Sequence, residues 1–156
     1  MTSMAPLRAA DAERMASLHA SAFPEGQAWH GSEFSKLLCQ SHIRGVGYLK
    51  GSDLLAFILI QHVTAEAEIL TLATHPDQRQ QGLARQLIRN LQQELAPQGL
   101  TRWLLDVAED NPGAIAFYEK LGFQIDGRRP QYYKRLEGTR VDAILMSKPV
   151  AGQVTP

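Results

Sequence analysis

Residues 68–95 form the segment that most constrains the fold of this chain. Residues 68–75 are rich in Ile, Leu and Thr, a composition typical of a buried strand. Residues 82–95 then carry an apolar stripe at the spacing of an α-helix, formed by Leu83, Leu87, Ile88, Leu91 and Leu95. A strand followed by a short loop and an amphipathic helix predicts an α/β unit in which the helix packs against a sheet.

The segments on either side complete a mixed pattern. Before this unit we expect helices over residues 10–22 and 30–40 and strands over residues 45–50 and 54–63. After it we expect a strand over residues 102–107, a helix capped by Asn111 and ended by Gly122, and strands over residues 123–125 and 143–146. Residues 127–140 are predicted to be a long connection. This order predicts a mixed α/β (α+β) sheet with helices on both faces.

Charge and hydropathy exclude several classes of protein. Basic and acidic residues number 16 each, so the formal net charge is zero. Nucleic-acid-binding proteins usually carry a basic excess, so no nucleic-acid partner is expected. The longest apolar run, residues 54–60, is far too short to cross a bilayer. The first residues lack the pattern of a signal peptide. We therefore expect a cytoplasmic protein without a membrane partner.

The length of 156 residues is that of one ordinary domain. We expect a single domain over residues 1–150 and a frayed tail over residues 151–156. Cys39 is the single cysteine, and its place beside Leu38 on a predicted helix favours a buried apolar role. His19, His30, His42 and His62 lack the spacing of metal ligands, so no metal site is predicted.

The start of the helix at Gly82 has the features of a phosphate site. The first turn of a helix leaves main-chain N–H groups unpaired, and the helix dipole favours an anion beside them. Gly82 and Ala84 keep this turn small, and Arg79 and Arg85 flank it with positive charge. The alternative is an ordinary helix start whose glycine permits close packing. The segment is neither a Walker loop nor a dinucleotide fingerprint, because no Gly-Lys-Ser/Thr and only one glycine are present.

Two motifs resemble those of the GCN5-related N-acetyltransferase (GNAT) superfamily. Arg79-Gln80-Gln81-Gly82-Leu83-Ala84 matches its Arg/Gln-x-x-Gly-x-Gly/Ala signature. A second signature, in the following helix, is matched by Asn111, Ala114, Tyr118, Gly122 and Phe123. Within the superfamily the chain is most similar to the RimI-like group of ribosomal-protein-alanine acetyltransferases. The shared segments are Ala22-Phe23-Pro24, Ala67-Glu68-Ile69-Leu70, Tyr132-Tyr133 and Asp142-Ala143.

The resemblance implies a GNAT fold, whose sheet splays open between its fourth and fifth strands, here residues 68–75 and 102–107. Acetyl-CoA is then the expected cosubstrate and lies in that notch. Its diphosphate would bind main-chain N–H groups of the helix start, and its pantetheine arm would run along the preceding strand. The implied cofactor-binding residues are Leu72, Ala73, Thr74, Arg79, Gln80, Gln81, Gly82, Leu83, Ala84, Arg85 and Asn111.

The resemblance also implies direct attack of an amine on the thioester, with one group accepting a proton and another donating one. Tyr118 matches the family's general acid; the alternative is a core tyrosine. Asp106 matches the position of the general base, where the family usually has Glu; the alternative is a strand-end aspartate bonded to nearby backbone. Glu68 is a second candidate base, or an outward-facing polar residue. Our hypothesis is that Asp106 is the base and that Glu68 orients water or binds the amine.

The RimI-like resemblance implies that the acceptor is the N-terminal amine, of alanine, in a small-subunit ribosomal protein, and that the enzyme is a monomer. In this group residues 23–29 and 128–135 flank the acceptor groove. The second segment is basic and aromatic here, which predicts acceptors with acidic residues unless it is only a solvated hairpin. Lys134 stands where the group usually has proline. The competing functions are acetylation of a small amine and acyl-CoA binding without turnover.

Overall fold

The computed structural model describes residues 1–150, so the predicted tail at residues 151–156 lies outside the described residues. A seven-stranded sheet has the strand order β1-β2-β3-β4-β5-β7-β6. All neighbouring strands are antiparallel except β4 and β5, which are parallel. The strands are β1 (Thr2–Pro6), β2 (Ile43–Lys50), β3 (Asp53–Val63), β4 (Glu66–Thr74), β5 (Arg102–Ala108), β6 (Gln124–Lys134) and β7 (Arg140–Pro149).

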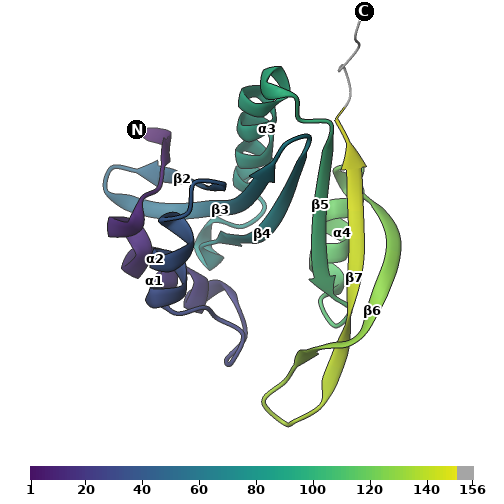
Figure 1. The fold of residues 1–156 in the computed structure, drawn as a ribbon. Coiled ribbons are helices and arrows are strands. Elements are labelled where there is room, and N and C mark those ends of the chain that lie inside the picture. Colours follow the sequence, from purple (N-terminus) through teal and green to yellow (C-terminus); the bar gives the residue numbers. More distant parts are fainter. Residues whose placement is uncertain (151–156) are drawn as a thin grey trace, which may run out of the picture.

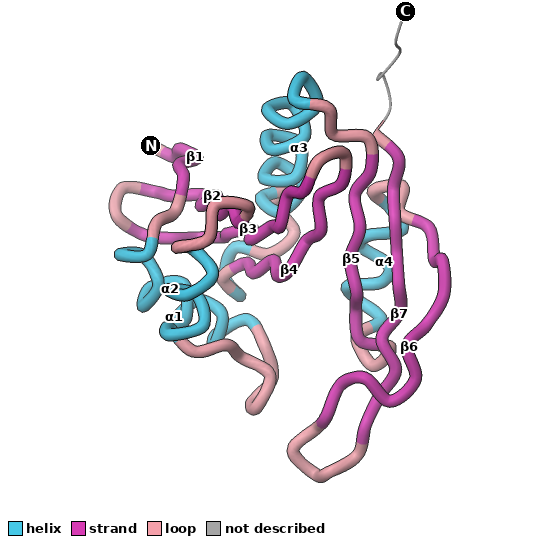
Figure 2. The backbone as a smooth tube through the Cα atoms, viewed as in Figure 1, coloured by secondary structure: helices cyan, strands magenta, loops and turns pink. Residues whose placement is uncertain are grey.

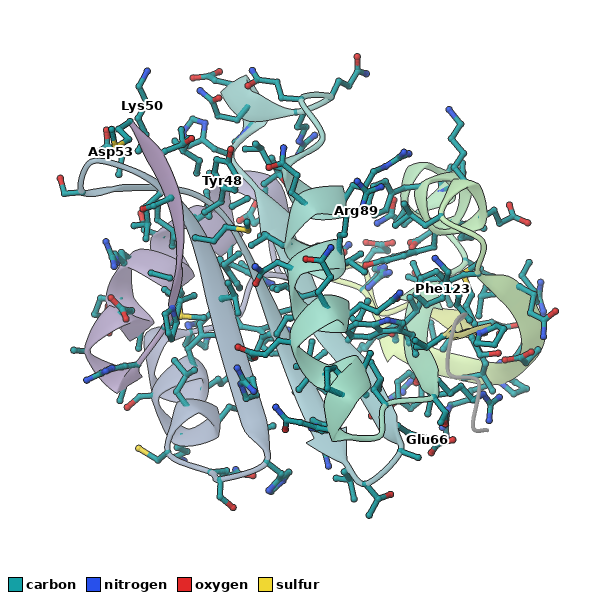
Figure 3. The ribbon with its side chains drawn as sticks, turned by 90° about the horizontal axis from the view of Figure 1, so that it is seen from above. Tyr48, Lys50, Asp53, Glu66, Arg89 and Phe123 are labelled. Carbon is teal, nitrogen blue, oxygen red and sulfur yellow. The ribbon has the colours of Figure 1, made fainter. Side chains whose placement is uncertain are left out.

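Helices cover both faces of this sheet, as predicted (Figure 1). They are α1 (Ala12–Ala22), α2 (Gly31–Leu38), α3 (Leu83–Leu95) and α4 (Pro112–Lys120). On one face, Met15 of α1 and Phe34 of α2 are buried against Phe57 and other residues of β3. On the other face, α3 and α4 share a second core with Trp103 and Met146. Seen from above, Arg89 lies on the side of α3 that faces α4 (Figure 3).

The sheet splays open between β4 and β5. Glu66–Ile69 pair in parallel with Arg102–Leu105, and the pairing ends there although both strands continue. Figure 2 shows the two strands parting beyond this point. The predicted GNAT-type sheet, splayed between these two strands, is therefore confirmed. The edge of β4 beyond Ile69 keeps main-chain groups that no strand pairs on this side, so an extended ligand can lie against it.

A β-bulge in β4 changes the face of the sheet to which its later side chains point. Leu59 of β3 pairs with Thr71 and Ile60 pairs with Ile69, which leaves Leu70 as an extra residue. Side chains alternate between faces along a strand, so one extra residue reverses the alternation. Ile69 accordingly packs in the core with α3 and α4, whereas Ala73 packs in the core with α1 and α2.

Two predictions about the strands were wrong. Residues 127–140 are not a long connection, because β6 and β7 form a hairpin joined by residues 135–139. Register shifts at Ile125/Gly127 and Arg129/Tyr133 interrupt the regular pairing of β6, and nearly all of its residues are exposed. An alternating apolar pattern is therefore missing. The first strand, β1, was also missed, since its five residues form a short and largely exposed edge strand.

One further detail differs from expectation. Cys39 is exposed, because it follows the last residue of α2 and lies beyond the buried side of that helix. The start of α2 is stabilised by Glu33, whose carboxylate accepts a hydrogen bond from the His30 main chain at 2.9 Å. Within residues 1–150, no helix combines the length and apolar character that spanning a membrane requires.

Candidate active site

The loop between β4 and α3 contains two residues with left-handed backbone conformation. Gln80 has a φ of 64° and Gly82 a φ of 77°. Such turns form concave nests of N–H groups that bind anions. A Cβ placed on Gly82 would meet no atom within 4 Å, so close packing does not explain the glycine. The left-handed conformation does explain it, because a residue with a Cβ adopts it at a cost.

Main-chain donors and an arginine converge at the same turn. The first hydrogen bond inside α3 runs from the Gln86 N–H to the Gly82 carbonyl at 3.0 Å. The N–H groups of Leu83, Ala84 and Arg85 therefore have no partner within the helix. Arg79 donates to the Ala22 carbonyl at 3.1 Å, which fastens the loop to the end of α1. Together these groups make a site suited to a phosphate group.

A cavity of about 690 Å³, here called the α3 cavity, lies against this turn. It extends from the start of α3 along β4 to the start of α4. Every residue predicted to bind the cofactor lines it except Gln81. Those lining residues are Leu72, Ala73, Thr74, Arg79, Gln80, Gly82, Leu83, Ala84, Arg85 and Asn111.

A second cavity of about 560 Å³, here called the hairpin cavity, lies on the other side of the splay. Its walls come from residues 23–30 between α1 and α2, from residues 69–72 of β4 and 105–108 of β5, and from the β6–β7 hairpin. Six residues line both cavities, so the two spaces meet in the notch between β4 and β5. These shared residues are Phe23, Gln27, Leu72, Asn111, Ala114 and Tyr118.

Tyr118 and Asn111 occupy the junction because of how α4 is built. Asn111 caps the helix, and its side-chain oxygen accepts a hydrogen bond from the Ala114 N–H at 3.1 Å. Tyr118 lies two turns further along α4, is buried, and packs edge-on against Phe123. Burial raises the pKa of the Tyr118 phenol well above its usual value of 10, because the charged form is desolvated. The phenol therefore keeps its proton at neutral pH.

Two carboxylates approach the notch from the opposite face. Glu68 is the register partner of Leu104, so its side chain lies on the same face as that of Asp106, two residues further along β5. Asp106 lines the hairpin cavity and lies 3.4 Å from Nε of Arg129. Burial and the charge of Asp106 raise the pKa of Glu68, and Arg129 opposes this shift. Glu68 does not itself line either cavity, although the two carboxylates are close enough to interact.

Arg128 and Arg135 of the β6–β7 hairpin are each paired with carboxylates. Arg128 binds Glu109 and Asp142, each at 2.8 Å. Arg135 binds both carboxylate oxygens of Asp110, at 2.9 and 2.7 Å. Of the hairpin cations that line the hairpin cavity, Arg135 is therefore paired, whereas Lys134 forms no salt bridge within residues 1–150, so acceptors with acidic residues stay a prediction that rests on Lys134. Sequence reasoning missed these pairs because the partners lie 14 to 25 residues apart, with no local signal.

The two rims of the hairpin cavity touch each other. A Cβ placed on Gly26, in the loop between α1 and α2, would lie 2.6 Å from Leu136 at the hairpin tip. The loop can approach the hairpin this closely because Gly26 has no side chain. Among residues 1–150, no three His, Cys, Asp or Glu side chains are grouped in a way that would hold a metal ion.

Comparison with known proteins identifies relatives of this architecture. The ribosomal protein bS18-alanine N-acetyltransferase of Escherichia coli (strain K12) is 41% identical over 96 residues, covering 62% of this chain. The match spans 64% of that relative, less than two thirds of its length. The N-alpha-acetyltransferase RimI of Mycobacterium tuberculosis is 33% identical over 132 residues, 82% of each chain. The predicted resemblance to the RimI-like group is thereby confirmed.

Solved structures agree with this result. The crystal structure of the ribosomal-protein-S18-alanine N-acetyltransferase from Escherichia coli has a TM-score of 0.86 and 30% identity, covering 100% of this chain and 99% of that one. Arabidopsis thaliana NAA60, solved in complex with acetyl-CoA, shares the fold with a TM-score of 0.84 at 20% identity, covering 97% and 100% of the two chains. The model of the acetyltransferase (GNAT) family matches residues 12–123, most of the sequence, and the chain therefore belongs to that family.

Proposed function

We propose that this chain is an acetyl-CoA-dependent N-acetyltransferase acting in the cytoplasm. Its acceptor is the N-terminal alanine of a small-subunit ribosomal protein. One observation carries the proposal: two cavities on opposite sides of the splayed sheet meet at Tyr118. A donor and an acceptor that bind in separate cavities can then react in a ternary complex without a covalent enzyme intermediate. The relative and the solved structure from Escherichia coli, whose names give the alanine of ribosomal protein bS18 or S18 as the acceptor, support this choice.

Binding of acetyl-CoA is assigned to the α3 cavity. The nest at Gln80 and Gly82 and the unpaired N–H groups that begin α3 suit its diphosphate. The free edge of β4 at Leu72, Ala73 and Thr74 suits the amide groups of the pantetheine arm. Arg79 and Arg85 line the same cavity and add positive charge. Acetyl-CoA supplies the activated acetyl group, and the remaining chemistry belongs to residues at the notch.

The acceptor amine must lose a proton before it can attack, since an N-terminal amine with a pKa near 8 is mostly protonated at neutral pH. The Asp106 carboxylate lines the hairpin cavity and Glu68 lies on the same face of the sheet, so these two groups are the candidates to accept that proton, directly or through a water molecule. The new C–N bond forms as the C–S bond breaks. Tyr118, kept protonated by burial, donates a hydrogen bond and then a proton to the departing sulfur.

The two carboxylates have different surroundings. Asp106 is within reach of the Arg129 guanidinium, whereas the pKa of Glu68 is raised by burial and by Asp106. A base with a pKa nearer to neutral accepts a proton more effectively. Asp106 lines the hairpin cavity and Glu68 does not, so the assignment of the base between them rests on the pH profiles described in the Discussion.

Peptide acetylation tests the proposal. Peptides of one sequence that begin with Ala, Ser, Met or Gly are incubated with acetyl-CoA, and thiol release is followed together with the mass of the peptide. We expect the Ala peptide to react fastest. The control is the Ala peptide with a formylated amine and an internal lysine, which should not react. Thiol release with small amines but with no peptide would support the small-amine function instead. Binding of acetyl-CoA by calorimetry without any turnover would support a non-catalytic acyl-CoA-binding protein.

A further inference from the structure

His19 is a fully buried polar residue that the proposed chemistry does not use. It lies in the last turn of α1 with no exposed surface. Its Nε2 lies 2.8 Å from the hydroxyl of Thr71 on β4. Its Nδ1 accepts a hydrogen bond at 3.1 Å from the main-chain N–H of Trp29, in the loop between α1 and α2. One side chain thus joins three separate segments of the chain.

The hydrogen bonds fix the protonation of the ring. The Trp29 N–H is a donor, so Nδ1 must be an acceptor without a proton. The proton of the neutral imidazole is therefore on Nε2, which donates to the Thr71 hydroxyl. Burial favours this neutral form and lowers the pKa of His19 to about 4. Both ring nitrogens are satisfied at neutral pH.

Aromatic rings hold His19 in place. The ring of Phe23 stacks on it with centroids 4.0 Å apart and an interplanar angle of 14°. Trp29 lies 5.5 Å away, and Phe34 packs edge-on at 5.4 Å. Histidine is the residue that can stack in such a box while bonding to partners on two sides. A phenylalanine at this position would keep the stacking and lose both hydrogen bonds.

The segments that His19 joins are opposite walls of the hairpin cavity. Phe23 and Trp29 line it from the loop between α1 and α2, and Thr71 lines it from β4. Thr71 follows the bulge at Leu70, which turns its hydroxyl toward α1. His19 does not line the cavity itself. Its two hydrogen bonds therefore hold one wall at a fixed distance from the other.

We propose that His19 is a positioning residue of the acceptor site, which fixes residues 23–30 against Thr71 and so holds the hairpin cavity in the shape that accepts the peptide. This inference rests on the proposed function, because it takes the hairpin cavity to be the acceptor site. The loop contacts the peptide, and His19 acts through the loop.

The test compares variants that remove the hydrogen bonds in different ways. His19→Phe removes both bonds, and Thr71→Val removes only the bond to β4. Two variants serve as controls. Thr71→Ser retains a hydroxyl at position 71. His62→Phe makes the same exchange at a partly exposed histidine of β3 that takes no part in the hydrogen bonds of His19. Hydrogen exchange at residues 23–30 is measured by mass spectrometry, together with the KM for the Ala peptide, kcat, and the Kd of acetyl-CoA.

We expect faster exchange at residues 23–30 in His19→Phe and in Thr71→Val. The KM for the peptide should rise by about five- to tenfold, the loss expected for one hydrogen bond. The Kd of acetyl-CoA and kcat should change less than about twofold. Thr71→Ser should recover most of the peptide KM lost in Thr71→Val, and His62→Phe should match the wild type. A merely structural residue would instead weaken peptide and acetyl-CoA binding alike.

The inference is overturned if exchange at residues 23–30 is unchanged in both bond-removing variants, or if the loop is released without a change in the peptide KM. Thr71→Val decides the matter if His19→Phe does not fold. Failure of the proposed function looks different, since the wild-type protein would then acetylate no peptide at all. Such a result also refutes the role of His19 in positioning the peptide site. The exchange data would still show whether His19 holds residues 23–30 in place.

Discussion

Arg135 and Asp110 join the hairpin to the start of α4 through two hydrogen bonds, from Nε and Nη2 of the guanidinium to the two carboxylate oxygens. Asp110 immediately precedes the Asn111 cap and lines the α3 cavity, whereas Arg135 lines the hairpin cavity. The hydrogen bond from Arg135 lowers the pKa of Asp110, so the carboxylate stays charged. The pair thus connects the walls of the two cavities.

Replacing Arg135 with Ala should weaken peptide binding. The pair is partly exposed, so we expect the peptide KM to rise by about fivefold at most, with little change in the Kd of acetyl-CoA. The peptide KM should also lose part of its dependence on salt. Arg14→Ala is the matched control, because Arg14 makes a similar pair with Asp11 on the surface. Equal effects of the two substitutions on the peptide KM would contradict the assignment.

Gly82→Ala should weaken acetyl-CoA binding by at least about tenfold, because the methyl group intrudes on the contacts between the phosphate and the main chain. Gly99→Ala is the control. Gly99 also has a left-handed φ, of 100°, and open space around a Cβ. Both substitutions should therefore lower stability by about 1 kcal/mol. Calorimetry measures the Kd, and thermal unfolding measures stability. A wild-type Kd in Gly82→Ala would remove the diphosphate from this turn.

The pH dependence of kcat/KM tests which carboxylate is the base. A base works in its deprotonated form, so kcat/KM rises as pH increases through its pKa. Burial and Asp106 raise the pKa of Glu68 and Arg129 lowers it. We expect Arg129→Gln to shift the acidic limb to higher pH and Glu68→Gln to abolish it. Deprotonation of the acceptor amine also raises kcat/KM with pH, and this contribution is the same in every variant. An unchanged limb in Glu68→Gln, with loss of activity in Asp106→Asn, would assign the base to Asp106.

Tyr118→Phe should lower kcat by about 10²- to 10⁴-fold, the usual contribution of a positioned acid. The ring remains, so the core packing of α4 and the Kd of acetyl-CoA should stay close to wild type. Tyr48→Phe controls for loss of a phenol elsewhere, since the Tyr48 hydroxyl lies near Thr2 at the sheet edge. A kcat within about threefold of wild type in Tyr118→Phe would show that the leaving sulfur needs no acid from this residue.

Sequence patterns predicted those parts of the fold that depend on local spacing. The stripe of α3, the Asn111 cap and the strands of the first core all follow from neighbours within a few residues. The β6–β7 hairpin does not, because its bulges and exposed side chains leave no periodic signal. His19 was considered only as a metal ligand. Its partner Thr71 is 52 residues away, and the bulge that turns Thr71 toward it has no mark in the sequence.

That bulge decides which side chains of β4 meet α1 and which meet α3. Removing Leu70 would restore regular pairing, because Thr71 would follow Ile69 directly and stay opposite Leu59, so every side chain from Thr71 onward would keep its present face. The Thr71 hydroxyl would still meet His19, whereas the Leu70 side chain that packs with the α1 core would be lost. We therefore expect a chain without Leu70 to keep both cores and the His19 contact, and to lose only the packing of that leucine.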